Sequence, residues 1–296
     1  MKIHKSPNAA KRILDTYDEL LKAWDVPFEE MNIDTSYGST HIIACGDTSN
    51  PPLVLFHGVG DTSALMWVYN AKALSEKFRL YAIDTIGGPG KSIPNGNYGV
   101  SFDCVKWLDE VLIALDLEKI YVAGVSMGGY IAQLYTLNRH NKVIKALCMA
   151  STVMADDSNT NFAMLRVFLP EALFPTKKNV IKLMKKLTGK NIEMLIDNAL
   201  ILEHYLYLLQ GFNNMAMRFH KIKKFNTDEI NKMRDKLYFL VGESDPFALY
   251  GGKEALIKHK MNVRFYPDVG HGINHEIPDM INNEIIDYFH SVNSVV

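Results

Sequence analysis

The chain has 296 residues, of which 48% are hydrophobic, and this composition is typical of a globular protein with a large buried core. Its formal net charge is −1 and no basic stripe runs along it, so the sequence gives no support for nucleic-acid binding. The first residues lead into no apolar signal segment and no apolar run reaches the length of a membrane span, so we expect a cytoplasmic protein.

Two features of composition have simple interpretations. The three cysteines, Cys45, Cys104 and Cys148, form no Cys-x-x-Cys pair, which favours buried free thiols in a reducing compartment. The Lys-rich stretch 177–190 is the one local excess of charge. A solvated helix face is favoured there over a phosphate-binding site.

The predicted elements begin with an amphipathic helix over residues 8–24. Its polar face mixes acids with bases, which favours a helix packed on the domain over one lying on a membrane surface. A hairpin follows, turning at residues 37–39, and strands then alternate with helices. Such alternation indicates crossover connections and a mostly parallel sheet covered on both faces. The strands are expected at 28–34, 40–46, 53–56, 78–84, 119–123 and 143–150, and the helices at 64–77, 102–115 and 127–138.

The alternation stops at about residue 151. From 153 to about 231 the pattern is helical and dense in Met, Leu and Phe, and strands return at 236–241 and 263–266 before a last helix at 278–290. We therefore expect a core domain formed by residues 1–152 and 232–296, with residues 1–27 as an N-terminal helical extension. Residues 153–231 would form an inserted helical cap.

The segment Gly124-Val125-Ser126-Met127-Gly128 is a Gly-x-Ser-x-Gly motif at a predicted strand-to-helix junction. A serine at such a junction lies on a sharp turn with its hydroxyl exposed at the end of a sheet. Ser126 is therefore a candidate nucleophile. A chance pentapeptide is the alternative, and a serine nucleophile also needs a base and a group that orients the base.

A candidate orienting carboxylate follows the strand at 236–241. Asp245 precedes Pro246, which restricts it to an extended backbone in a loop at the carboxyl end of the sheet. Asp-Pro is also a common turn signal, and Glu243 and Asp268 are rival carboxylates. Asp245 is favoured over Glu243 because it lies deeper in the loop.

A candidate base follows the strand at 263–266. His271 lies between Gly270 and Gly272, which suits a tight turn that presents an imidazole, whereas the rival His275 lacks such neighbours. The two histidines are four residues apart, as metal ligands on a helix can be. The glycines argue against a helix, and no Glu completes His-Glu-x-x-His, so no metal is expected.

An oxyanion hole would complete the chemistry. The backbone N–H of Met127 follows the nucleophile directly, and the N–H of Val59 lies in the loop after the strand at 53–56. His57 is expected to order that loop rather than act as a base. The run from Gly87 to Ser92 resembles a phosphate loop but lacks its first glycine, so nucleotide binding is not expected.

Together these motifs resemble the α/β-hydrolase superfamily, and within it the capped carboxylesterase-like hydrolases of bacteria. The resemblance covers roughly residues 40–150 and 232–290. The loop after Asp84 has one residue more than the usual Asp-x-x-Gly-x-Gly-x-Ser, which changes the shape expected at this rim. The matching residues are His57-Gly58, Asp84 with 87–92, Gly124 to Gly129, Gly242 with Asp245, and Gly270-His271.

The resemblance implies a serine hydrolase that cleaves small to medium carboxylic esters through an acyl-enzyme on Ser126, with no cofactor and a small-molecule ester as its partner. The nucleophile of dehalogenases and epoxide hydrolases is aspartate, which Ser126 argues against. Hydrolysis of a C–C, amide, lactone or thioester bond by the same triad stays open, as does a non-enzymatic ligand receptor. The sequence does not indicate the oligomeric state.

Overall fold

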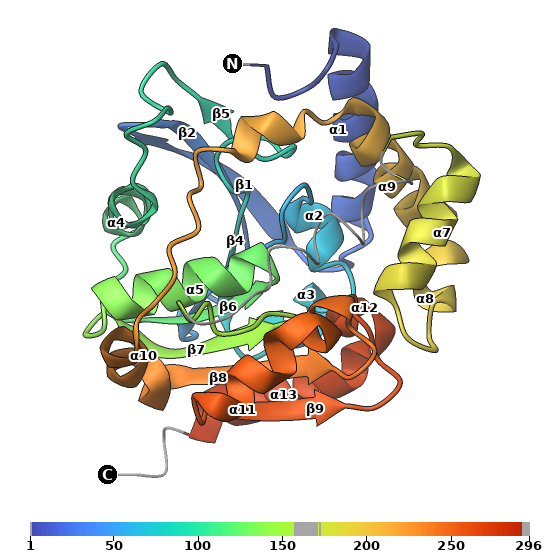
Figure 1. The fold of residues 1–296 in the computed structure, drawn as a ribbon. Coiled ribbons are helices and arrows are strands. Elements are labelled where there is room, and N and C mark those ends of the chain that lie inside the picture. Colours follow the sequence, from blue (N-terminus) through green and yellow to red (C-terminus); the bar gives the residue numbers. More distant parts are fainter. Residues whose placement is uncertain (1, 157–170, 172, 292–296) are drawn as a thin grey trace.

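The computed structural model describes residues 2–156, 171 and 173–291. Within them a nine-stranded sheet has the order β1-β2-β4-β3-β6-β7-β8-β9, and β5 pairs with β2 (Figure 1). β1 and β2 form the expected antiparallel hairpin. The parallel strands are β3, β4, β6, β7, β8 and β9. The strands are β1 Phe28–Thr35, β2 Gly38–Cys45, β3 Pro52–Phe56, β4 Arg79–Ile83, β5 Ile93–Pro94, β6 Ile120–Val125, β7 Val143–Met149, β8 Leu237–Gly242 and β9 Asn262–Tyr266.

Helices cover both faces of this sheet, as the runs of apolar residues in its strands predict. In β3, Leu53 and Leu55 face one hydrophobic cluster, whereas Val54 and Phe56 face the other. The first cluster receives α1 Pro7–Lys22, α2 Ser63–Met66, α3 Ala71–Ser75 and α13 Pro278–His290. The second receives α4 Cys104–Ala114, α5 Met127–Asn138, α10 Thr227–Met233 and α11 Lys253–Lys258.

The β7–β8 insertion, meaning the chain between those two strands, contains helices joined by loops in its described part. Helices α7, α8 and α9 lie together beside α1 (Figure 1), whereas α10 packs against α5. Residues 157–170 and 172 of the segment predicted to be helical and rich in Met, Leu and Phe lie outside the described residues. The elements are α7 Lys177–Leu187, α8 Glu193–Ile196, α9 Ala199–Gly211, the short helix Asn214–Met217 and α10.

The N-terminal segment is joined to this insertion. The backbone N–H of Lys5 donates to the Gly211 carbonyl (2.8 Å), and Asn213 N–H donates to the carbonyl of Ile3 (2.9 Å). Further along α1, the Thr16 hydroxyl contacts His204 Nδ1 of α9 at 2.7 Å. Helix α1 is therefore packed within the protein, as its mixed polar face predicts. Among the helices described, none has both the length and the apolar character needed to cross a bilayer.

The helix expected over 64–77 is instead two short helices, α2 and α3. The carbonyl of Met66 accepts a hydrogen bond from the Asn274 side chain (2.6 Å), and Asn70 pairs with Asn282 (2.8 Å). The first of these contacts occupies a backbone carbonyl that a continuous helix would use as an acceptor. The short elements β5, α11 and α12 (Ile273–Glu276) were not predicted. Cys45, Cys104 and Cys148 are free thiols.

Candidate active site

Ser126 lies on a strained turn between β6 and α5. Its φ of 55° and ψ of −113° place it in a region that non-glycine residues rarely adopt. The turn is held from both sides, because Ser126 N–H donates to the Met149 carbonyl (2.9 Å) and Tyr130 N–H donates to the Ser126 carbonyl (3.2 Å). The neighbouring strand and the first turn of α5 thus fix the serine where the sequence predicts it.

The two glycines of the motif are required by close packing around this turn. A Cβ atom on Gly124 would lie 2.2 Å from the carbonyl carbon of Gly128. A Cβ atom on Gly128 would lie 2.3 Å from the carbonyl oxygen of Phe56 in β3. Any side chain at either position would push the turn away from the sheet.

Asp245 and His271 meet at the carboxyl ends of β8 and β9. His271 Nδ1 donates to Asp245 Oδ2 at 2.8 Å. The carboxylate is 1% exposed, and its Oδ1 accepts from the backbone N–H of Phe247 at 2.8 Å. The backbone N–H of His271 donates to the Leu187 carbonyl at 2.5 Å. His271 is therefore held by hydrogen bonds through both its ring and its backbone.

The rival residues point elsewhere. Glu243 pairs with Lys253 at 2.7 Å, and Asp268 pairs with Lys190 at 2.5 Å, both near the surface. His275 is buried, and its Nε2 contacts the Leu65 carbonyl at 3.1 Å. Burial lowers the pKa of His275 to about 4, so its ring is neutral at physiological pH.

Glu276 is a buried carboxylate that sequence reasoning missed. Its Oε1 accepts from Gly270 N–H (3.0 Å), beside His271, and its Oε2 accepts from Gly189 N–H (2.7 Å) in the β7–β8 insertion. Burial raises the pKa of Glu276. No local pattern could reveal this role, because Gly189 lies far from Glu276 in the sequence.

The loop after β3 lies beside Ser126. A Cβ atom on Gly58 would be 3.6 Å from the Ser126 Cβ, and Val59 is 41% exposed. His57 orders the loop, as expected: Nδ1 donates to the Gly58 carbonyl (2.7 Å) and Nε2 accepts from Thr85 N–H (2.9 Å). Burial lowers the pKa of His57, which agrees with a neutral ring that donates at one nitrogen and accepts at the other.

The loop after β3 also carries a buried carboxylate, Asp61, which faces the insertion. Asp61 Oδ1 accepts from Thr62 N–H at 2.7 Å, and the Asp61 carboxylate also has a side-chain hydrogen bond with Tyr205 of α9. Burial raises the pKa of Asp61 to about 7. A Cβ atom on Gly60 would lie 3.4 Å from Asn214 Oδ1, so the insertion packs directly on this loop.

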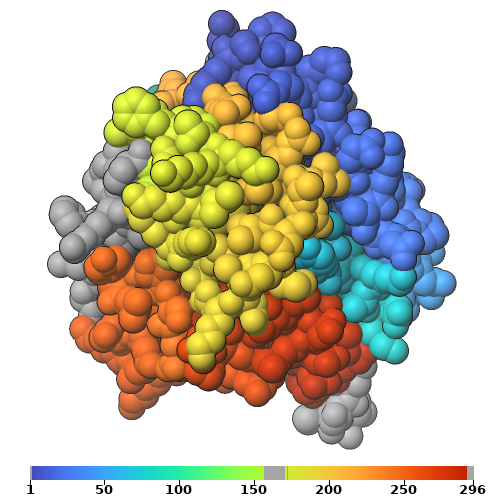
Figure 2. Space-filling view, turned by 90° about the vertical axis from the view of Figure 1, so that its right-hand side faces the viewer, coloured from blue at the N-terminus to red at the C-terminus, as the bar shows by residue number. Residues whose placement is uncertain are grey.

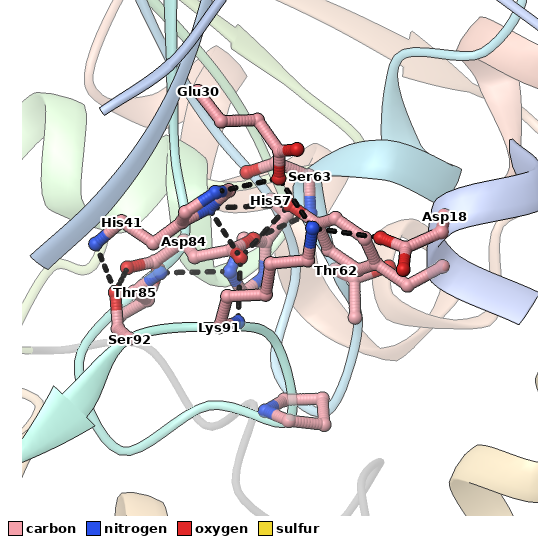
Figure 3. Close-up of polar contacts among 12 residues, drawn as sticks. Asp18, Glu30, His41, His57, Thr62, Ser63, Asp84, Thr85, Lys91 and Ser92 are labelled. Atoms are coloured by element: carbon pink, nitrogen blue, oxygen red, sulfur yellow. Dashed lines mark hydrogen bonds and ion pairs between the residues drawn. The ribbon is translucent and has the colours of Figure 1, made fainter. Parts of the chain in front are cut away.

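Asp84 is the centre of a buried polar network behind the loop (Figure 3). Its carboxylate accepts from the Tyr17 hydroxyl (3.0 Å), His41 Nδ1 (3.2 Å), Ser63 N–H (3.0 Å) and Lys91 N–H (2.8 Å). Burial alone would raise the pKa of Asp84. The hydrogen bond and charge of His41 help to outweigh burial and hold this pKa well below its usual range.

The same network fixes the rim loop that carries the extra residue. The Ser92 hydroxyl donates to the Asp84 carbonyl (2.6 Å) and accepts from His41 N–H (2.8 Å). The Lys91 ammonium pairs with Asp18 (2.7 Å) and with Glu30, so it is neutralised by two carboxylates. The ammonium group of Lys91 is thus engaged in ion pairs within the protein.

This chain is similar to known proteins in its family profile, in its sequence and in its structure. A family profile described as "alpha/beta hydrolase fold" matches residues 51–178. A Bacillus subtilis protein named uncharacterized carboxylesterase nap is 29% identical over 300 residues, which cover 95% of this chain and 93% of that protein. The Bacillus subtilis carboxylesterase YbfK is 37% identical over 139 residues, about 47% of either chain.

A solved structure agrees with these sequence matches. The crystal structure of naproxen esterase from Bacillus subtilis superimposes with a TM-score of 0.83 at 25% identity. The superposition covers 96% of this chain and 99% of that one. The likeness therefore extends over the sheet, the flanking helices and the β7–β8 insertion.

Proposed function

This chain has the α/β-hydrolase fold and is a carboxylesterase-like hydrolase, and we propose that it cleaves small to medium carboxylic esters through an acyl-enzyme on Ser126. The observation that carries the proposal is the hydrogen bond of 2.8 Å between His271 Nδ1 and Asp245 Oδ2, formed at the sheet edge where Ser126 occupies its strained turn. A nucleophile, a base and an orienting carboxylate are the groups that ester hydrolysis by serine requires.

In the proposed reaction, the Ser126 hydroxyl oxygen attacks the ester carbonyl carbon while Nε2 of His271 takes the hydroxyl proton. Asp245 holds the imidazole through Nδ1 and stabilises its charged form. The tetrahedral oxyanion accepts hydrogen bonds from the N–H groups of Val59 and Met127. His271 then returns the proton to the leaving alcohol as the C–O bond breaks. Water, deprotonated by His271, hydrolyses the acyl-enzyme and frees Ser126.

We also propose that residues 153–231 act as a cap on a core formed by residues 1–152 and 232–296. The contacts of Asp61 with Tyr205 and of His271 with Leu187 support this, because each joins the insertion to a loop of the candidate site. The free thiols support a reducing compartment, the cytoplasm, as the place where the protein works.

The test is steady-state hydrolysis of p-nitrophenyl acetate, butyrate and octanoate. We expect multiple turnover on at least one ester and a fall in kcat of roughly 10⁴-fold or more in Ser126→Ala. Ser151→Ala is a matched control, because Ser151 follows the neighbouring strand β7 at the same sheet edge, and it should stay within a few-fold of the wild type. Turnover that persists in Ser126→Ala would contradict the proposal.

The naproxen esterase similarity suggests one further substrate. We propose that esters of bulky aryl-substituted carboxylic acids are also accepted, and naproxen methyl ester would test this next to the p-nitrophenyl series. Hydrolysis of the p-nitrophenyl esters without hydrolysis of naproxen methyl ester would restrict the proposal to unhindered substrates and leave the triad assignment in place.

A further inference from the structure

The charge of this chain is distributed unevenly. Residues 171–190 contain six lysines and one acid, Glu171, so this stretch carries +5 while the whole chain carries −1. The remainder must then total −6. A protein with one strongly basic segment on an acidic body has a preferred orientation toward an anionic surface.

The lysines occupy one face of α7. The opposite face packs into the protein through Val180, Leu183 and Met184, so the helix is anchored and its basic side is turned outward. The exposed lysines of this helix are Lys177, Lys178, Lys182 and Lys185. In Figure 2 the yellow-green residues of this segment form part of the molecular surface of the insertion.

The position of the first lysines is unfavourable for the helix itself. Lys177 and Lys178 begin α7, and its first turn holds no acidic residue. Positive charges at a helix N-terminus are repelled by the helix dipole. Helix α10 shows the favourable arrangement, with Asp228 and Glu229 in its first turn. Lys177 and Lys178 are therefore placed without benefit to helix stability, whereas Lys185 and Lys186 lie in the last turn, where the dipole favours positive charge.

Internal ion pairs neutralise only part of this charge. Glu171 pairs with Lys182 (3.2 Å) and Lys186 (2.6 Å), and Lys190 pairs with Asp268. In the part of the chain that the structure describes, Lys177, Lys178 and Lys185 have no acidic partner within ion-pair distance. Three positive charges on one helix face thus remain available for a partner.

Two large apolar side chains lie next to these charges. Leu173 is 64% exposed and Phe174 is 71% exposed, and both lie a few residues before the start of α7 at Lys177. A solvated helix face would explain the lysines but not the adjacent exposed leucine and phenylalanine. Basic residues beside exposed apolar side chains are the combination that binds the interface of an anionic bilayer.

We propose that this basic face, defined as Leu173, Phe174, Lys177, Lys178, Lys182 and Lys185, docks the protein on an anionic phospholipid surface. The lysines would contact lipid phosphates, and the two apolar side chains would enter the headgroup region. A nucleic acid or an acidic protein would also bind the lysines, but it would not surround Leu173 with an apolar environment comparable to that of the headgroup region. The proposal is independent of the ester chemistry at Ser126.

The test is co-sedimentation of the full chain with vesicles. We expect binding to phosphatidylcholine–phosphatidylglycerol vesicles, no binding to phosphatidylcholine alone, and weaker binding as salt rises. Each lysine near the surface contributes a factor of about 5 to partitioning, so the triple variant K177A/K178A/K185A should lose about 100-fold. Phe174→Ser should lose about 10-fold, because it removes an inserted apolar group.

The double variant K77A/K232A is the matched control, since it removes two exposed lysines outside the basic face, and it should lose no more than about 2-fold. Solution hydrolysis of a p-nitrophenyl ester should be unchanged in every variant, which reports that each is folded. Equal vesicle binding by the wild type and the triple variant would overturn the proposal. So would wild-type protein that binds heparin or nucleic acid but no vesicles.

Discussion

The backbone N–H of His271 donates a hydrogen bond of 2.5 Å to the carbonyl of Leu187, the last residue of α7. The loop that carries this imidazole is therefore held by the β7–β8 insertion as well as by the sheet. Glu276 reinforces the connection, since its two oxygens accept from Gly270 on one side and Gly189 on the other. A movement of α7 would move the imidazole with it.

Glu276 should thus act as a positioning residue for His271. We expect Glu276→Ala to lower kcat about 10-fold with little change in KM, because the loop loses its anchor while the substrate pocket stays intact. Two buried N–H groups also lose their acceptor, so unfolding free energy should fall by about 1–3 kcal/mol. Steady-state kinetics and denaturant titration measure both. The exposed Glu254→Ala is the control, and equal kinetics for the two variants would refute the role.

The assignment of the base can be tested by comparing two histidines. We expect His271→Ala to lower kcat by about 10³-fold or more while the melting temperature changes little. His275→Ala should keep kcat within a few-fold but lower stability by about 1–3 kcal/mol, because the Leu65 carbonyl loses its partner in the core. Ester kinetics and thermal melting separate the two. The opposite pattern would assign the base to His275.

Asp61 should make stability depend on pH. Its pKa in the folded protein is about 7 because of burial, against 3.8 in a model peptide, so the folded state holds this proton more tightly. Unfolding free energy should therefore fall as pH rises from about 4 to about 7, by up to about 4 kcal/mol, and level off above that.

Asp61→Asn removes the titration while keeping an oxygen for the Thr62 N–H. The difference in unfolding free energy between this variant and the wild type should grow across that pH range, in favour of the variant at high pH. Denaturant titrations at closely spaced pH values measure the difference. A constant difference from pH 4 to pH 8 would mean that Asp61 does not titrate in this range.

Asp84 should be among the most important polar residues for stability. We expect Asp84→Ala to cost about 3–5 kcal/mol, because removal of the carboxylate leaves the Tyr17, Ser63 and Lys91 donors without their buried acceptor. Asp18→Ala, which removes an exposed partner of Lys91, should cost less than about 1 kcal/mol. Chemical denaturation of both variants checks this, and similar losses would contradict a central role for Asp84.

The sequence predicted those parts of the site that depend on local signals. The turn at Ser126 requires glycines within a few residues of it, and Asp245 and His271 each follow a strand that its own apolar pattern reveals. Parallel strands then bring these loops to one edge. The pairing of Asp245 with His271 was expected from the loops in which they lie, Asp245 before Pro246 and His271 between two glycines.

The parts that were missed depend on residues far apart in the sequence. Glu276 accepts a hydrogen bond from Gly189 N–H, and Asp61 has a hydrogen bond with Tyr205. Neither carboxylate lies in a recognisable sequence pattern. The prediction of one helix over residues 64–77 was wrong for a related reason. The side chain of Asn274 donates a hydrogen bond to the Met66 carbonyl, which a continuous helix would use within its own backbone. Propensity describes local preference, and tertiary hydrogen bonds override it.

The pairing of the N-terminal segment with residues 211–213 has a consequence for biosynthesis. Lys5 cannot form its hydrogen bond with Gly211 until residue 211 has been translated. Helix α1 therefore cannot complete its native packing until most of the chain has emerged. During that time the apolar stripe of α1, including Ile13, which packs against Gly211 of α9, has no native surface on α9 to cover. The nascent chain therefore exposes the apolar face of this early-synthesised amphipathic segment for a long time. Chaperones that bind nascent chains early would contact it.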